Sequence, residues 1–385
     1  MSDIWHFPRP ELAENYLRQF NEFGLKRITL FAPRRTGKTQ FLIKDLAPAA
    51  EQAGYLVCYV SMWEQKDAPH TALKDCFDDA KKRIEQNKSM FSRFFAAKIN
   101  KVKFDSEVPG LGKFATDIEF AENPKKASAG ELQELLTSYK SFQEVLGKKP
   151  FLLLIDEIQH LATNAKFEPL TYTLRTILDM SPDNIRVIFT GSSRSGLTRL
   201  FRDSKAPFFN FADTMKFPLL GEDFVLHLES VYQKVSGKSL NHSQLLEIFE
   251  ALDHNAFYMH ALIKTIAMQA FEDLDSAYKE LLDNIADESE FETLWDKLTV
   301  AERYVFGAIS AQIAIFSEDN LSELKHSEWG RLDRMTLQRA LLKLEQKGLI
   351  FKEGHGKYNI EQDTLLRWAR RNKKLLLSAP RKHST

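Results

Sequence analysis

Apolar residues in the first half of this chain fall into short continuous runs, separated by longer stretches in which they recur at helical spacing. The runs at 55–60 and 151–155 are continuous, and strand-like runs that include polar residues stand at 28–31 and 184–190. The helical patterns cover residues 1–26, 41–50, 63–90, 129–147 and 165–181. Strands that alternate with helices in this way predict an α/β fold built on a parallel sheet.

Two further patterns interrupt or follow this alternation. Residues 98–104 and 113–120 alternate between apolar and polar positions around a Pro-Gly turn, which predicts a β-hairpin or a small sheet inserted at about 95–122. Its basic residues either contact a partner or coat an exposed structural hairpin; they are Lys98, Lys101, Lys103 and Lys113. Residues 221–290 are a run of amphipathic helices, which we expect to form a small domain after a core spanning 1–220.

The last part of the chain, from about residue 291, has its own pattern. Helical spacing is followed by two strands, with two glycines in the turn between them. The predicted helices cover 301–311, 320–324 and 335–347, and the strands cover 348–352 and 357–360. This order predicts a winged-helix domain over 291–385, a module whose third helix can enter the major groove of DNA.

The loop between the first predicted strand and the next helix carries the clearest chemistry. Its sequence follows the pattern G-x-x-x-x-G-K-[ST], except that Ala32 replaces the first glycine and fits if its φ is negative. Gly37 allows a tight turn around a phosphate, Lys38 reaches the β- and γ-phosphates, and Thr39 ligates Mg²⁺. The expected nucleotide-binding residues are Pro33, Arg34, Arg35, Thr36, Gly37, Lys38, Thr39 and Gln40.

Two acids follow the most apolar run of the chain. Residues 151–155 read as a buried central strand, and Asp156 and Glu157 come directly after it. Ligands of open α/β sheets bind at the carboxyl ends of strands, and charges there need partners. We therefore expect Asp156 to hold Mg²⁺ together with Thr39, and Glu157 to be the catalytic general base that polarises the attacking water.

Polar residues also end the strand pattern at 184–190. Thr190, Ser192 and Ser193 are candidates for sensing the γ-phosphate, and Arg194 is a candidate cation. Of these, Ser192 and Arg194 join Glu157 and Lys38 as predicted catalytic residues, although an ordinary strand-to-loop turn explains the same residues. Arg199 and Arg202 stand where a neighbouring subunit can donate an arginine to the γ-phosphate, unless they are ordinary solvated arginines.

Composition sets the broad class. The chain has 385 residues, enough for two or three domains, with 43% hydrophobic and 28% charged residues. Its net charge is zero, but residues 331–385 contain 14 Lys/Arg against 5 Asp/Glu, a net charge of +9. The basic tail at 367–374 and at Arg381-Lys382 is the electrostatic footprint of a DNA-binding surface, or a site for an acidic protein.

Apolar runs, the N-terminus and the cysteines indicate where in the cell the protein is expected. The longest apolar runs are far too short for a membrane span, and the N-terminus does not read as a signal peptide. Cys58 and Cys76 are the only cysteines, which form neither a disulfide framework nor a zinc cluster. We expect a reduced, cytoplasmic protein whose only metal is Mg²⁺.

Several of these segments together resemble the archaeal-type ATPase family, within the broader STAND and AAA-like P-loop ATPases. The matching segments are 7–12, 33–39, 154–157, 190–193, 206–209 and 217–220. The resemblance covers roughly residues 5–270 and implies an ATPase core, a helical lid and a C-terminal winged helix, with Phe7 and Pro8 packed near the adenine. The family's Gly-Gly-x-Pro-like lid turn is replaced here by residues 254–257, with no arginine at the lid's sensor position, so His254 is an alternative sensor.

These features predict a switch driven by Mg-ATP. The first hypothesis is an ATPase that hydrolyses ATP to ADP and phosphate while acting on double-stranded DNA through residues 331–385. The second is a STAND-type signalling or defence module that forms homo-oligomers with ATP and uses its winged helix for protein contacts. The third is a nucleotide-binding scaffold with little turnover.

Overall fold

The computed structural model describes residues 3–86, 124–268, 273–285, 289–327, 329, 332–354, 356–361, 363–372 and 376. Within these ranges the chain divides into two compact units, and the division falls between Ala277 and Tyr278. The hairpin predicted at about 95–122, with its four lysines, lies outside the described residues.

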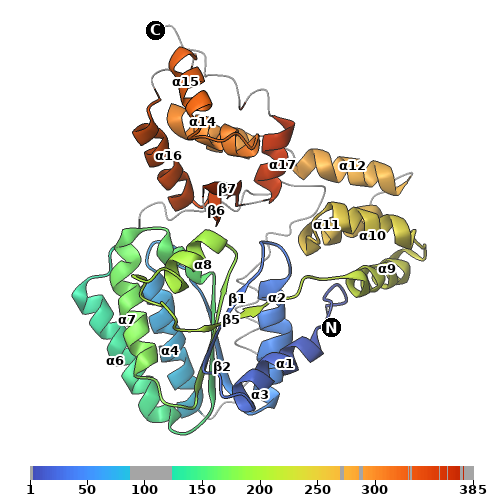
Figure 1. The fold of residues 1–385 in the computed structure, drawn as a ribbon. Coiled ribbons are helices and arrows are strands. Elements are labelled where there is room, and N and C mark those ends of the chain that lie inside the picture. The colour runs from blue at the N-terminus through green and yellow to red at the C-terminus, as the bar shows by residue number, and fades with distance from the viewer. Residues whose placement is uncertain are drawn as a thin grey trace. The chain divides into compact units, whose positions relative to one another are not determined.

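A five-stranded parallel sheet forms the centre of the first unit, in the order β2-β3-β4-β1-β5 (Figure 1). The strands are β1 (Arg27–Phe31), β2 (Leu56–Ser61), β3 (Phe151–Asp156), β4 (Ile185–Gly191) and β5 (Asp213–Lys216). The predicted α/β fold and parallel sheet are confirmed, and the first four strands lie where the apolar runs predicted them. The fifth strand was missed because its sequence is mostly exposed at the sheet edge and contains no apolar run.

Helices cover both faces of this sheet (Figure 1). The layer on one face contains α4 (Pro69–Glu85), α6 (Ala129–Leu146), α7 (Glu168–Asp179) and α8 (Arg194–Phe201), and α1 (Pro10–Asn21) covers the other face. Short 3₁₀ turns at Ile158–Ala162 and Ala165–Phe167 connect β3 to α7. Successive strand residues point to opposite faces, so Leu153 packs in the first layer and Leu152 in the second.

One helical run follows the P-loop, which is the loop of residues 32–39. It consists of α2 (Lys38–Phe41), a π-helical turn (Leu42–Leu46) and α3 (Ala47–Gln52). The run begins at Lys38, directly after Gly37. This start lies three residues before the one that the sequence predicted. The P-loop follows β1, and Asp156 and Glu157 stand at the end of β3. These two strands are separated in the sheet by β4 alone.

Three helices complete the first unit after β5. They are α9 (Glu222–Ser236), α10 (His242–Ala251) and α11 (Ala256–Met268), and α9 packs on both of the others. We call them the helical group α9–α11, and Figure 1 shows them gathered beside one another in yellow. The helix α12 (Leu274–Ile285) runs across the division between the units.

The second unit is a helical bundle with a two-stranded sheet. Its helices are α13 (Ser289–Asp296), α14 (Val300–Ser310), α15 (Glu318–His326), α16 (Arg334–Gln346) and α17 (Asp363–Arg371). The antiparallel strands β6 (Ile350–Gly354) and β7 (Lys357–Ile360) lie between α16 and α17 in the chain. Residues 367–371, which we predicted as part of a basic tail, instead belong to α17, because Trp368 and Ala369 are buried in the core of this unit.

Among the helices that the structure describes, none is both long enough and apolar enough to cross a bilayer.

Candidate functional site

The P-loop begins at the end of β1 and curls into the start of α2. Ala32 is buried and does not have a positive φ, so alanine fits the first position of the motif as predicted. Gly37 has a φ of 85°, a conformation that strains any residue with a side chain. The Thr36 hydroxyl donates to the carbonyl oxygen of Pro33 at 2.8 Å and closes the turn.

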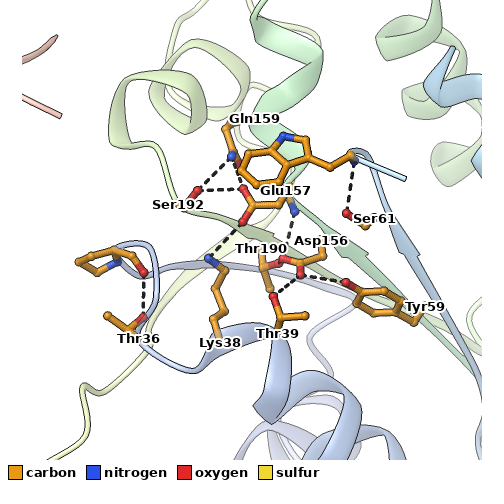
Figure 2. Close-up of polar contacts among 12 residues, drawn as sticks. Thr36, Lys38, Thr39, Tyr59, Ser61, Asp156, Glu157, Gln159, Thr190 and Ser192 are labelled. Atoms are coloured by element: carbon orange, nitrogen blue, oxygen red, sulfur yellow. Dashed lines mark hydrogen bonds and ion pairs between the residues drawn. The ribbon is translucent and has the colours of Figure 1, made fainter. Parts of the chain in front are cut away.

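Asp156 collects hydrogen bonds from four groups at the end of β3 (Figure 2). One carboxylate oxygen accepts from the hydroxyl of Thr39 at 2.7 Å and from that of Tyr59 at 3.0 Å. The other accepts from the Thr190 hydroxyl and from the backbone N–H of Glu157. The side chain is almost fully buried, so these donors supply the stabilisation that a buried carboxylate needs.

Tyr59 is a member of this network that the sequence did not reveal. Burial raises the pKa of Tyr59 well above its ordinary value, and the neighbouring Asp156 carboxylate raises the pKa further. The phenol therefore stays protonated and donates to Asp156. The alternation of β2 places Tyr59 on an inward face, but nothing in the sequence tells which residue of β3 lies beside it.

The oxygens of Thr39 and Asp156 suit a magnesium ion. Mg²⁺ prefers hard oxygen ligands and is held in proteins by one or two carboxylates together with phosphate oxygens and water. Across the described ranges, no group of three or more His, Cys, Asp or Glu side chains gathers in a way that holds a metal by itself. A hydroxyl and a carboxylate in contact at 2.7 Å therefore fit an ion that arrives with a phosphate ligand.

Glu157 has different neighbours from Asp156 (Figure 2). Its Oε2 atom accepts hydrogen bonds from the hydroxyl of Ser192, at 2.8 Å, and from the side-chain amide of Gln159. Its Oε1 atom lies 3.8 Å from the ammonium of Lys38, and both side chains are buried. The predicted catalytic residues Lys38, Glu157 and Ser192 are thus brought together, on three different elements.

Gln159 is the second residue that sequence reasoning missed. Its amide nitrogen lies between Glu157 and Ser192, at 3.2 Å from the serine hydroxyl. A Cβ atom added at Gly191 would lie 2.5 Å from Gln159 Oε1, and one added at Gly196 would lie 2.6 Å from Gln159 Cβ. The two glycines therefore leave room for this side chain.

The other residues predicted after β4 have separate positions. Thr190 donates to Asp156, whereas the hydroxyl of Ser193 accepts from the backbone N–H of Gly196 and caps α8. Arg194 is exposed, and its guanidinium lies over the ring of Phe31 at 4.8 Å.

The remaining predicted residues lie on several surfaces. Arg199 donates to the carbonyl oxygen of Ala162 at 3.3 Å, and Arg202 is exposed. Pro33 and Gln40 are half-buried, Gln40 on α2. The two P-loop arginines are held by aromatic rings, Arg34 by Trp63 at 4.8 Å and Arg35 by two rings of α11.

Phe7 lies against the helical group α9–α11. Its ring meets the rings of Phe224 and His227 edge-on, at 5.9 and 5.5 Å between centroids, while Pro8 is exposed. His254 pairs its Nδ1 atom with the carbonyl oxygen of Leu220 at 3.0 Å. This bond ties the turn before α11 to the segment leading into α9.

Comparison with known proteins gives a fold but no sequence family. No family model matches the chain, and no curated protein matches it. The Walker-type ATPase PABY2304 of Pyrococcus abyssi is similar in structure, with a TM-score of 0.59, 16% identity, and coverage of 95% of this chain and 99% of that one. The ADP form of the Aeropyrum pernix ORC2 protein has a TM-score of 0.53, 14% identity, and 98% coverage of each chain.

A second structure of the Aeropyrum pernix ORC2 protein, described as ADPNP–ADP complexes, has a TM-score of 0.51 and 13% identity, with coverage of 95% and 92%. Identities of this size show a shared fold and nothing finer. The parallel sheet, with the loop after β1 and the acids after β3 at the same edge and β4 between the two strands, agrees with that likeness. The chain has the P-loop NTPase fold.

Proposed function

We propose that this chain binds Mg-ATP at the P-loop, hydrolyses it to ADP and phosphate, and acts as a nucleotide-dependent switch. The observation that carries the proposal is the convergence of Lys38, Thr39, Asp156, Glu157 and Ser192 at one edge of the sheet (Figure 2). The similarity in fold to a Walker-type ATPase, and to a protein seen with ADP and ADPNP, supports it.

Each residue has a chemical role in this proposal. The backbone N–H groups of the P-loop and the start of α2 bind the phosphates, and Lys38 reaches their terminal oxygens. Thr39 and Asp156 hold Mg²⁺, which neutralises charge that develops on the phosphates. Glu157 orients the attacking water and accepts its proton through Oε1, while Ser192 and Gln159 hold Oε2.

We infer from the residues around the site where the rest of the nucleotide binds. We assign the helical group α9–α11 as the lid, with Phe7 and the adjoining Pro8 near the adenine. Phe7, Phe224 and His227 form a cluster of rings between the N-terminal segment and α9. Aromatic side chains can stack on bases.

Replacement of Lys38 by alanine tests the site. Lys38→Ala should weaken binding of a fluorescent ATP analogue by about 30-fold or more, because the phosphates would lose the buried ammonium group that pairs with them. Lys44→Ala is the matched control, since Lys44 lies in the same helical run and pairs with Asp3 at 2.7 Å. Tight binding retained by Lys38→Ala would show that the P-loop is not the nucleotide site. Binding by the wild type without turnover would instead support a nucleotide-binding scaffold.

We propose further that the second unit is a winged helix that binds double-stranded DNA through α16. The exposed residues of this helix include Arg334, Gln338, Arg339 and Lys343. Its one acid, Glu345, is half-buried, so the exposed face is positive. A positive helix face with amide side chains suits a phosphate backbone and base edges.

A specific observation favours a second candidate, in which the same helix binds a protein. Met335 and Leu342 also lie on the exposed part of α16, with 58% and 55% of their surface accessible. Apolar side chains in such positions are typical of interaction surfaces. In that case the chain is a STAND-like switch that assembles with ATP into homo-oligomers, and sedimentation with and without Mg-ATP distinguishes the two candidates.

A further inference from the structure

Arg35 lies in the P-loop two residues before Gly37 and has a left-handed backbone, with φ at 64°. This conformation is uncommon for any residue other than glycine. Its carbonyl oxygen accepts a hydrogen bond from the backbone N–H of Phe257 at 3.3 Å. Phe257 belongs to the first turn of α11, so the backbone of the phosphate-binding loop is joined directly to the lid.

The side chain of Arg35 makes a second connection to the same turn. Its guanidinium lies 4.6 Å from the ring centroid of Phe257 and 5.1 Å from that of Tyr258. One of its nitrogens also donates to the Tyr258 hydroxyl at 2.5 Å. Arginine is well suited to such a position because its planar group stacks on rings and donates hydrogen bonds at the same time.

The neighbouring arginine of the loop is attached elsewhere. Arg34 lies over Trp63, which follows β2 in the sheet, at 4.8 Å. The two arginines therefore extend from adjacent positions of one loop to different parts of the unit, Arg34 to the sheet side and Arg35 to the lid. This difference gives a natural control for any effect of Arg35.

The turn that Arg35 contacts is itself fixed within the lid. The side-chain oxygen of Asn255 accepts from the backbone N–H of Tyr258 at 3.2 Å, which caps the start of α11. His254 joins the same turn to the segment before α9, and α11 packs on α9. A change at Arg35 is therefore passed to a helix pair and not only to one side chain.

We propose that Arg35 is a positioning residue that couples occupancy of the P-loop to the lid through Phe257 and Tyr258. The inference rests on the proposed function, because it assumes that the loop binds phosphates. Binding phosphates fixes the loop backbone, of which Arg35 is part, and the shared hydrogen bond and ring contacts transmit that constraint to α11. By linkage, the position of the lid changes the affinity of the loop by the same factor.

Hydrogen exchange of the full chain tests the coupling, with Mg-ADP and a slowly hydrolysed ATP analogue as probes. Without nucleotide, Arg35→Ala should speed exchange of the amides of α11 by about 2- to 30-fold, the factor that matches removal of a cation–π interaction. Tyr258→Phe, which keeps the ring, should give a smaller increase. Arg34→Ala should leave exchange of α11 unchanged.

The response to nucleotide separates coupling from binding. At nucleotide concentrations that saturate each protein, as confirmed by fluorescence, nucleotide should slow exchange of α11 in the wild type and in Arg34→Ala, but not in Arg35→Ala. If Arg35→Ala binds too weakly to saturate, Tyr258→Phe decides: a reduced lid response at full occupancy supports the coupling, and a full response overturns it.

Two other results distinguish failure of the coupling from failure of the proposed function. If Arg35→Ala binds nucleotide and its α11 amides respond as in the wild type, the coupling is wrong and the proposed function stands. If the wild type binds no nucleotide, the proposed function is wrong and the coupling falls with it.

Discussion

Glu157 has a φ of 54°, and Arg35 in the P-loop has a φ of 64°. A left-handed backbone at a residue with a side chain costs about 1–2 kcal/mol, so surrounding contacts must hold it. At Glu157 those contacts are the hydroxyl of Ser192 and the amide of Gln159. Both unusual residues contact groups outside their own segment, which indicates that the fold keeps a strained backbone where the site needs it.

Removing the charge of Glu157 tests its role as base. Glu157→Gln keeps the size of the side chain and should bind ATP, but single-turnover hydrolysis should fall by about 10²- to 10⁴-fold, the usual contribution of a general base. Glu51→Gln is the control, since Glu51 is a buried acid paired with Arg83, at 3.3 Å and on a different element. Near-normal turnover in Glu157→Gln would show that another group activates the water.

The close approach of Gly196 to Gln159 allows a more indirect test. In Gly196→Ala the new methyl group would lie 2.6 Å from Gln159 Cβ, so the backbone or Gln159 must shift. Turnover should fall while nucleotide affinity changes little, because Lys38 and Thr39 are untouched. Gly130→Ala is the control, with no neighbour closer than 3.9 Å. Equal turnover in the two variants would mean that Gln159 does not position Glu157.

At the scale of elements, the sequence predicted the four buried strands of the parallel sheet and missed the fifth, which is exposed. The apolar runs at β1 to β4 are buried on both faces, which makes a continuous apolar pattern. β5 lies at the edge and is mostly exposed, so no pattern marks it. α17 was hidden by its charges, since its basic residues resemble a solvated tail although Leu365 and Trp368 are buried.

The site was predictable only where a motif fixed it. The P-loop and the acid pair follow known chemical patterns, so Lys38, Thr39 and Asp156 could be placed from the sequence alone. Tyr59 and Gln159 depend instead on which side chains meet across the sheet edge. That information lies in the register of β2, β3 and β4, which local patterns do not specify.

An ion pair between a buried carboxylate and a partly exposed lysine joins α14 to the end of α16 in the second unit. Glu302 of α14 lies 2.8 Å from the ammonium of Lys347, which follows α16, and also accepts from the backbone N–H of Thr299. Burial by itself would raise the pKa of Glu302, but these two donors outweigh it and lower the pKa below its ordinary value of 4.5. The carboxylate therefore stabilises the folded unit only while it is ionised.

This pair predicts a pH-dependent stability. At pH 7, Glu302→Gln should lower the free energy of unfolding by about 1–3 kcal/mol, toward the low end because the Lys347 side chain is partly exposed. The pKa of Glu302 is depressed, so its contribution is complete above the ordinary value and disappears as the pH falls through the lowered one. Urea denaturation of both proteins from pH 7 to pH 3 should therefore converge in acid. Glu323→Gln, at an exposed acid of α15, is the control, and a constant difference at every pH would contradict the assignment.

At the scale of the whole molecule, zero net charge conceals two charge distributions of opposite sign. Residues 331–385 carry a net charge of +9, which leaves −9 for the rest of the chain. Within the part of that segment whose side chains the structure describes, the exposed face of α16 is a positive surface on a regular element. A surface of this kind binds polyanions with an affinity that depends strongly on salt.

The exposed face of α16 can be tested without truncating the second unit. Replacing Arg334, Arg339 and Lys343 by glutamine should weaken binding of double-stranded DNA and reduce the salt dependence of its affinity, by about one unit of slope for each phosphate that is no longer neutralised. Replacing Met335 and Leu342 by serine keeps the charges and is the matched control, which should bind DNA as the wild type does. ATP turnover measured with and without DNA, at low and moderate salt, tests whether DNA binding affects hydrolysis. Stimulation that disappears in the glutamine variant would make DNA the effector of the ATPase. Turnover indifferent to DNA, together with failure of ATP-dependent assembly in the serine variant, would instead identify α16 as a protein-binding surface, because only the apolar side chains would then matter.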